Sequence, residues 1–329
     1  MKPCVIGGAG FIGTSICRNL TGRGVDFVIV DQKPSVSFPA SGRLSDIRDM
    51  QGLMATVEGD TIIHLAAVHR DDVRPVTLYD EVNVEGTRNV CRVASAKGIN
   101  RIVFASSVAI YGFAPENTSE DGKIAPFNAY GRTKHEGETI LCDWQRDDPQ
   151  NRCLVIVRPT VVFGPGNRGN VFNLMRQVQS GFFVMVGNGR NRKSLAYVEN
   201  VAAYFVHCLT AENGIHVVNY ADKPDLDMNA LVSLVRGRIR GKVGVGFRLP
   251  VSVGLAMGRL ADVVAKASGR SLPISWIRVK KFITTTSFAS TAHETAGFRA
   301  PVDLRDGLTR TLESDFIHPD PDAPVFFSE

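Results

Sequence analysis

A short glycine-rich segment near the start of the chain constrains the fold more than any other feature. The segment reads GGAGFIG at residues 7–13, directly after an apolar run at residues 3–6 and at the head of a run with helical spacing. Between a strand and a helix, the first glycine of such a turn permits the tight bend. The second lets the main chain approach a pyrophosphate, and the third packs the helix on the strand. The segment therefore predicts a dinucleotide-binding turn, with Gly7, Gly10, Phe11 and Ile12 as cofactor contacts.

Asp31 strengthens this prediction because it stands where such a turn needs an acid. It ends the apolar run of residues 25–30, and an acid about 20 residues past the last glycine accepts hydrogen bonds from both ribose hydroxyls. A carboxylate at this place also repels a 2′-phosphate. We therefore expect NAD rather than NADP, a preference that the nearby Lys33 weakens slightly.

The order of apolar runs predicts the fold class. Runs at residues 25–30, 61–66, 101–105, 153–157 and 216–219 alternate with helical patterns, as in an α/β fold with a doubly wound parallel sheet, the Rossmann arrangement. After residue 221 this rhythm ends. We expect an NAD-binding domain at residues 1–165, to which 195–221 return, a smaller and mostly helical substrate-binding lobe at 166–194 and 222–318, and a loosely ordered tail at 319–329.

Composition excludes several classes of protein. The net charge of +5 over 329 residues is scattered, which argues against a nucleic-acid partner and against a membrane-binding patch. Six cysteines without a C-x-x-C pair indicate a reducing compartment, and the absence of a leader or an integral membrane segment indicates a soluble, cytoplasmic protein. The amphipathic stretch at residues 251–267 could pack in the core, cover the active site or touch a membrane, and the core is the favoured place.

Tyr130 and Lys134 form the candidate catalytic pair. A spacing of four places both on one face of a helix, where the lysine and a nicotinamide cation would stabilise the phenolate that a tyrosine base requires. Ser107 is the third candidate. It follows a predicted strand, where its hydroxyl could bond the oxygen that is oxidised. No metal ligand is predicted.

These motifs together resemble the extended short-chain dehydrogenase/reductase family, in particular the nucleotide-sugar epimerases. The resemblance covers residues 1–220 well and the rest loosely. Its matching segments are residues 7–13, Asp31, Asp46-Ile47, residues 64–67, residues 83–87, residues 106–112, Tyr130 with Lys134, Arg158-Pro159, residues 164–166 and residues 197–201. The resemblance implies further NAD contacts from Asp46, Ile47, Leu65, Ala66, Ala67, His69 and Pro159, beside Tyr130 and Lys134.

The resemblance also narrows the reaction. Relatives that dehydrate, decarboxylate or epimerise two carbons carry acids or a cysteine directly after the strand-end Ser or Thr, where this chain has Val108 and Ala109. The remaining groups suffice to move a hydride and one proton at a carbinol. The leading hypothesis is an NAD-dependent 4-epimerase of UDP-hexose type. The alternatives are a nucleotide 4-keto-6-deoxy-sugar 4-reductase of surface polysaccharide biosynthesis and, from another class, a dinucleotide-sensing regulator.

Substrate contacts are the least determined part of the site. Ser107, Asn170, Arg192, Lys193 and Arg278 are candidates to hold the diphosphate of a UDP-sugar and its sugar. This chain has Val161 where such epimerases often have Asn, and Lys193 where they often have Arg, so the substrate could differ. The helical stretches at residues 77–96 and 126–147 are long enough to form a homodimer interface.

Overall fold

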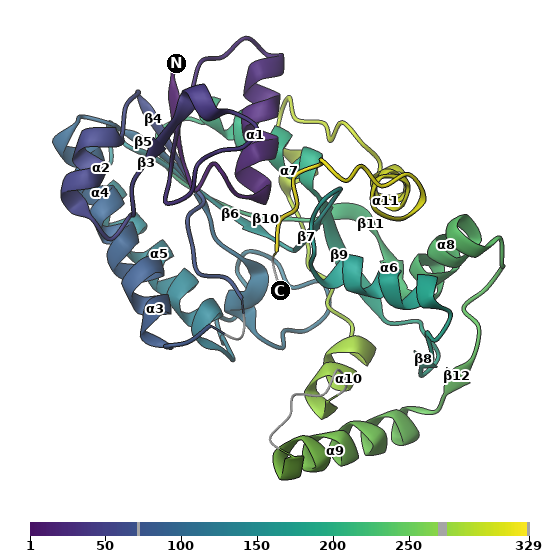
Figure 1. Ribbon diagram of the computed structural model, residues 1–329. Coiled ribbons are helices and arrows are strands. Elements are labelled where there is room, and N and C mark those ends of the chain that lie inside the picture. Colours follow the sequence, from purple (N-terminus) through teal and green to yellow (C-terminus); the bar gives the residue numbers. More distant parts are fainter. Residues whose placement is uncertain (71–72, 269–274, 328–329) are drawn as a thin grey trace.

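A seven-stranded parallel sheet organises the molecule (Figure 1), and the computed structural model describes residues 1–70, 73–268 and 275–327. The strands lie in the order β10-β6-β5-β4-β1-β2-β3, so the order reverses between β1 and β4. The strands are β1 (Pro3–Ile6), β2 (Val28–Asp31), β3 (Gly42–Leu44), β4 (Thr61–His64), β5 (Arg101–Ala105), β6 (Cys153–Pro159) and β10 (Gly214–Tyr220). The predicted α/β fold with a parallel sheet is confirmed, and the ligand crevice of such a sheet lies at this reversal.

Helices cover both faces of the sheet because its central strands are buried at nearly every position. Along β1, Val5 joins one buried cluster while Cys4 and Ile6 join the other, as a period of two requires. One face is covered by α1 (Phe11–Gly22) and α7 (Val198–His207). The other face is covered by α2 (Met50–Thr56), α4 (Gly86–Ala96) and α5 (Ala129–Arg146).

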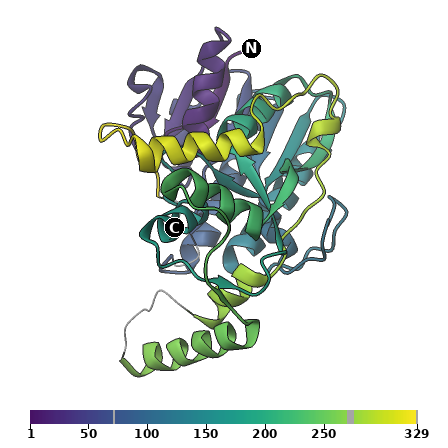
Figure 2. The same ribbon diagram turned by 90° about the vertical axis from the view of Figure 1, so that its right-hand side faces the viewer.

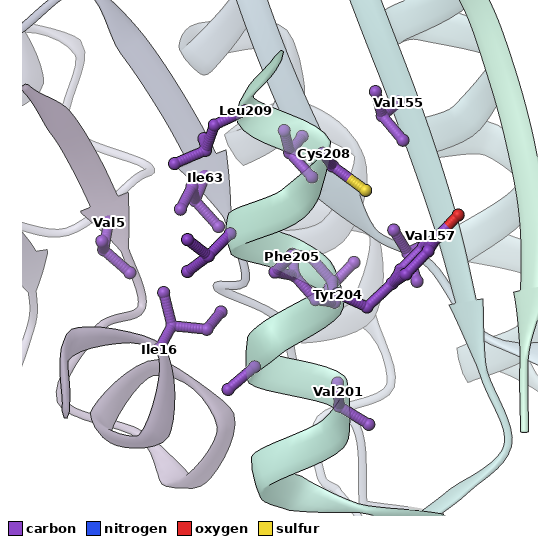
Figure 3. Packing of buried hydrophobic residues seen from close by; sticks show 14 of the residues in the cluster. Val5, Ile16, Ile63, Val155, Val157, Val201, Tyr204, Phe205, Cys208 and Leu209 are labelled. Atoms are coloured by element: carbon purple, nitrogen blue, oxygen red, sulfur yellow. The ribbon is translucent and has the colours of Figure 1, made fainter. Parts of the chain in front are cut away.

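Figure 3 shows the first of these faces, where α7 lies beside α1 and packs on the strands. Phe205 and Tyr204 project from α7 toward Ile16, Ile63 and the valines of β6. Cys208 and Leu209 follow in η4 (Cys208–Thr210), a 3-10 turn that extends the same apolar stripe. This packing holds α7 against the sheet on which the site is built.

A second lobe surrounds the carboxyl ends of the strands. Its sheets are small, and α6, α8 and α11 pack on them around a separate apolar cluster. The strands are β7 (Val161–Phe163), β8 (Met185–Val186), β9 (Arg192–Tyr197), β11 (Asp222–Asp227) and β12 (Arg248–Leu249). The helices are α6 (Asn170–Ser180), α8 (Met228–Arg240), α9 (Val251–Ser268), α10 (Trp276–Ile283) and α11 (Leu304–Leu312). The domain boundaries remain a prediction.

Short helical turns complete the chain. They are η1 (Pro39–Ser41), α3 (Thr77–Tyr79), η2 (Asp80–Glu85), η3 (Val108–Tyr111), η5 (Ala292–Glu294) and η6 (Glu313–Ile317). The predicted helix at residues 77–96 is thus α3, the π-turn η2 and α4 in succession. The predicted helix at residues 126–147 begins later, at Ala129, because Asn128 caps it by accepting a hydrogen bond from the Gly131 N–H at 2.9 Å.

One segment differs from the sequence-based picture, and the tail, whose order remains a prediction, contacts both lobes. The favoured core position for residues 251–267 is wrong, since Figure 1 shows α9 at the edge of the molecule, beside α10 and away from the sheet. Within the tail at 319–329, of which 328–329 lie outside the described residues, Phe326 exchanges main-chain hydrogen bonds with Gly166 and Arg168 at 2.9 and 2.7 Å. Its ring also lies 5.6 Å from that of Phe11.

The α7 packing can be tested by truncating Phe205, which has no exposed surface. Phe205→Ala should lower the free energy of unfolding by about 3–5 kcal/mol, because it leaves a cavity between α7 and the sheet. Phe182→Ala, at a side chain that is 90% exposed, should change it by less than about 0.5 kcal/mol. Urea unfolding of both variants makes the comparison, and equal effects would contradict the assigned packing.

Candidate active site

The glycine turn lies at the reversal of strand order. Gly7 has a φ of +83°, and a Cβ there would lie 2.6 Å from the Ala66 main-chain nitrogen, so the turn after β1 touches the loop after β4. A Cβ on Gly13 would lie 2.5 Å from the Cα of Gly8. On Gly10 it would meet only the Gly7 oxygen, at 3.3 Å. The first turn of α1 is therefore packed against the strand on one side and open to an anion on the other.

Asp31 stands beside this turn at the end of β2. Its two carboxylate oxygens accept hydrogen bonds from the main-chain N–H groups of Ala9 at 3.1 Å and Lys33 at 3.0 Å. Burial raises the pKa of this carboxyl group. An acid fixed next to a glycine-rich turn suits the ribose and pyrophosphate of a dinucleotide. The residues present therefore fit NAD.

The remaining candidate cofactor contacts border the same crevice or its approach. Leu65 and Ala66 donate main-chain hydrogen bonds to the Ile6 oxygen and thereby fix the loop after β4. Ile47 is buried against Gly86. Asp46 pairs with Arg48 at 2.7 Å, and the hydrogen bond from Arg48 lowers the pKa of the Asp46 carboxyl group. The others lie around the same strand ends: Phe11 and Ile12 open α1, Ala67 and His69 follow β4, and a buried Pro159 ends β6.

Tyr130 and Lys134 lie in the first turns of α5, as their spacing predicts. The Lys134 side chain is only 2% exposed, and its ammonium lies 4.3 Å from the centre of the Phe104 ring. Burial lowers the pKa of Lys134 to about 7. The site therefore keeps a cation poised to change its charge near neutral pH, next to the residue predicted to act as a base.

Ser107 lies where the start of α5 meets the end of β5. It caps η3, and its Oγ accepts a hydrogen bond from the Ala109 N–H at 3.1 Å. A Cβ on Gly131 would lie 2.5 Å from the Ala109 oxygen, so the first turn of α5 abuts η3 at the residue next to Tyr130. The structure thus joins the two segments that carry the predicted catalytic residues.

A buried ion pair beneath these segments was missed by sequence analysis. Arg158 of β6 donates to both carboxylate oxygens of Glu138 in α5, at 2.9 and 2.7 Å, and Ser106, directly after β5, donates to the same carboxylate. Burial raises the pKa of Glu138, but hydrogen bonds from His135 and Arg158 outweigh it and hold the pKa below its usual value. The only sequence signal was the spacing of Glu138 one further turn beyond Lys134.

Asn83 is a second supporting residue that sequence analysis named only as part of a motif. Its amide bonds Val68 in both directions, accepting from the N–H at 2.8 Å and donating to the oxygen at 2.9 Å, and it also donates to Thr133 in α5 at 2.9 Å. This single side chain therefore ties the loop after β4 to the helix of Tyr130. Nearby, burial lowers the pKa of His64 to about 3, so its ring is uncharged.

The structure brings the predicted substrate contacts together less clearly than the predicted catalytic residues. Lys193 in β9 is engaged within the protein, since its ammonium donates to the main-chain oxygens of Lys281 and Thr284 at 2.8 and 2.6 Å. Burial lowers the pKa of Lys193 to about 8. Arg192 in β9, Asn170 at the start of α6 and Arg278 in α10 are exposed. Their role in binding substrate remains a prediction.

Comparison with known proteins places this arrangement among characterised sugar enzymes. The model of a family described as "NAD dependent epimerase/dehydratase family" matches residues 4–221. The chain is 42% identical, over 99% of its length and 98% of the relative, to N-acetyl-alpha-D-glucosaminyl-diphospho-ditrans,octacis-undecaprenol 4-epimerase of Escherichia coli O157:H7. It is 27% identical, over 94% and 93%, to UDP-glucose 4-epimerase of Vibrio cholerae.

Among solved structures, the chain is similar to UDP-glucose 4-epimerase of Thermus thermophilus in complex with NAD. The TM-score is 0.72 and the identity 22%, with 95% of this chain and 98% of that chain covered. At this identity the likeness supports the fold. The predicted fold is confirmed, including the smaller region that follows the sheet.

The buried Lys134 should make stability depend on pH. Because folding lowers its pKa from 10.5 to about 7, the unfolded chain binds more protons between these values, so Lys134 adds stability as the pH rises through this range. Lys134→Met should abolish this contribution and, at pH 7 and below, unfold with a free energy a few kcal/mol higher than that of the wild type. Urea titrations from pH 6 to 10 measure the difference, and a gap that stays constant with pH would contradict it.

The Glu138–Arg158 pair should show strong coupling. Arg158→Met leaves a buried carboxylate without its partner and should cost about 3–5 kcal/mol of stability. The double variant Glu138→Met/Arg158→Met should unfold closer to the wild type than Arg158→Met does, since no buried charge is left unpaired. A double-mutant cycle by urea unfolding gives the coupling. Simple addition of the two single losses would show that the pair does not act as one unit.

Proposed function

Because this chain belongs to the NAD dependent epimerase/dehydratase family, we propose that it inverts C4 of an N-acetylhexosamine held on a polyprenyl diphosphate. The observation that carries this proposal is the 42% identity, over nearly the whole of both chains, to an enzyme named for that reaction. The 27% identical relative is also named a 4-epimerase, but of UDP-glucose. Inversion at C4 is thus common to both relatives, and they differ in the group that carries the sugar.

The residues of the site can perform this inversion with one base. NAD is the cofactor, and when bound it supplies a hydride acceptor that returns the hydride after the sugar has turned. Tyr130 takes the proton from the sugar 4-hydroxyl and later gives it back to the 4-keto oxygen. Ser107 hydrogen-bonds that oxygen, and Lys134 favours the phenolate while it is charged. No net oxidation results, so no outside reductant is consumed.

The residues after Ser107 support a single-carbon reaction. Val108 and Ala109 occupy η3, where a dehydration would need a separate acid and base. Neither side chain can exchange a proton. Tyr130 then remains as the base at the sugar hydroxyl, and inversion by oxidation and re-reduction at one carbinol requires only one.

A UDP-hexose is the second candidate substrate, favoured by the 27% identity to the Vibrio cholerae enzyme. Both substrates present a diphosphate next to the sugar, and they differ in whether a nucleoside or an isoprenoid chain follows. The 4-ketoreductase alternative differs in stoichiometry, since it would consume one equivalent of NADH. Assembly into a homodimer through α4 and α5, and action in the cytoplasm, complete the proposal.

One assay series separates these candidates. The purified protein is incubated without added NADH with polyprenyl diphosphate N-acetylglucosamine in detergent, with UDP-N-acetylglucosamine and with UDP-glucose, and the sugars released by mild acid are separated. The proposal expects the galacto epimer from the polyprenyl substrate at a kcat/KM at least tenfold above that of either UDP-sugar. A preference for a UDP-sugar would overturn the proposed carrier, and turnover that requires stoichiometric NADH would overturn the epimerase.

Tyr130→Phe should lower kcat by roughly 10²–10⁴-fold, the usual contribution of a positioned acid or base. It should still purify with NAD, detected by absorbance after denaturation, because the glycine turn and Asp31 are unchanged. Tyr204→Phe is the matched control, since its hydroxyl lies 3.3 Å from Thr295 on the face of the sheet covered by α7. It should retain activity, and an active Tyr130→Phe would mean that another group is the base.

A further inference from the structure

Large apolar side chains are exposed on α9, at the edge of the molecule farthest from the N-terminus. Leu260 is 65% and Val263 64% exposed, and Val253, Met257 and Val264 are each above 40%. Both Figure 1 and Figure 2 show α9 as the outermost element, with α10 between it and the rest of the protein. Exposed apolar side chains gathered on one helix mark an interaction surface.

The exposed side chains form one stripe along the helix. Val253, Met257, Leu260 and Val264 follow each other at intervals of four, three and four residues, which keeps them on one face. The neighbouring face carries glycines instead. A Cβ on Gly258 would lie 2.8 Å from the Cα of Trp276. The helix therefore packs on α10 through its smallest residues and turns its largest ones outward, which we define as the α9 stripe.

Gly254 repeats this arrangement one turn earlier. A Cβ at this position would lie 2.5 Å from a methyl carbon of Val186 in β8, so the beginning of α9 is also held by a glycine contact. Because the glycine face of α9 is the one that fits closely against the protein, the larger side chains of the α9 stripe must point outward.

Basic residues accompany the stripe. The described parts of α9 and α10 contain one acidic residue, Asp262, whose carboxylate accepts a hydrogen bond from the Trp276 N–H at 3.0 Å. The same two helices carry five basic residues, namely Arg259, Lys266, Arg278, Lys280 and Lys281. Apolar side chains next to an excess of positive charge complement the boundary between the headgroups and acyl chains of an anionic bilayer.

The surface continues from α10 to the active site. The Lys280 ammonium lies 4.9 Å from the Trp276 ring and 5.3 Å from the Phe113 ring. Phe113 stacks on Phe127 at 4.9 Å, and both rings are about half exposed. These two phenylalanines belong to the segment between η3, which follows Ser107, and α5, which carries Tyr130. Apolar and cationic side chains thus connect α10 to the segment that links the two predicted catalytic residues in sequence.

We propose that the α9 stripe, with the basic residues of α9 and α10, docks the protein on the surface of an anionic membrane. The inference rests on the proposed function, since a polyprenyl diphosphate sugar keeps its isoprenoid chain in the bilayer while the sugar must reach Tyr130. In this arrangement α9 lies in the plane of the interface. Among the described residues no helix is long and apolar enough to span a bilayer, and a helix lying at the interface needs no such length.

Vesicle binding tests the proposal on the full chain. The protein is sedimented with vesicles of phosphatidylethanolamine and phosphatidylglycerol, and with vesicles of phosphatidylcholine alone. We expect stronger binding to the anionic vesicles, weakened by salt, and a loss of about tenfold or more in the partition coefficient for Leu260→Asp/Val264→Asp. Equal binding to both kinds of vesicle, or no binding by the wild type, would overturn the proposal.

Leu44→Asp is a matched control because Leu44 is also 65% exposed but lies on β3, an edge strand of the parallel sheet, and not on α9. It should bind vesicles as the wild type does. Circular dichroism and the turnover of UDP-N-acetylglucosamine, a substrate without a lipid, check that Leu260→Asp/Val264→Asp remains folded. If that variant binds vesicles normally but changes from dimer to monomer in light scattering, the stripe is an interface between copies and the proposal fails.

The outcome is separable from that of the proposed function. Turnover of the polyprenyl substrate in detergent without vesicle binding would refute membrane docking and leave the activity in place. Vesicle binding without turnover of that substrate would refute the proposed carrier and leave the docking surface in place. If both hold, Leu260→Asp/Val264→Asp should lose activity on substrate embedded in vesicles while keeping it on substrate in detergent.

Discussion

The buried pair of Glu138 and Arg158 is the interaction on which the geometry of the site depends. It joins α5, which carries Tyr130 and Lys134, to β6, while Ser106 links the same carboxylate to β5. Charges withdrawn from water in this way require close and nearly complete pairing. The pair therefore fixes the position of α5 against the strand ends, and Gly131 allows the helix to approach η3 closely, which joins the segments that carry Ser107 and Tyr130.

Much of this arrangement could be predicted from local pattern. The glycine turn, Asp31 and the Tyr130–Lys134 spacing each follow from a backbone or charge requirement that acts within a few residues, and the structure places all of them as expected. Six of the seven strands of the main sheet were predicted because a buried parallel strand is largely apolar, whereas the exposed edge strand β3 was not. Helix starts were less accurate. The predicted helix begins at Pro126, whereas the Asn128 cap makes α5 begin at Ala129.

Features that depend on distant contacts escaped prediction. Nothing near Lys193 in sequence indicates that its ammonium reaches two carbonyls at the end of α10. Nor does the pattern of α9 reveal its orientation, because the same amphipathic periodicity fits a buried helix and an exposed one. The glycines at positions 254 and 258 could have indicated the orientation of α9, since they mark the side that packs closely. The group that carries the sugar could likewise not be predicted, because the sequence after residue 221 offers no motif with a known mechanism.

The contact between Phe326 and the first turn of α1 brings together residues that are 315 positions apart, from 11 to 326. Main-chain bonds from Phe326 to Gly166 and Arg168 add the second lobe to the same junction. During translation, the nucleotide turn leaves the ribosome long before Phe326, and this junction cannot close until residue 326 has emerged. Maturation of the region around α1 is thus completed only after both lobes have been synthesised.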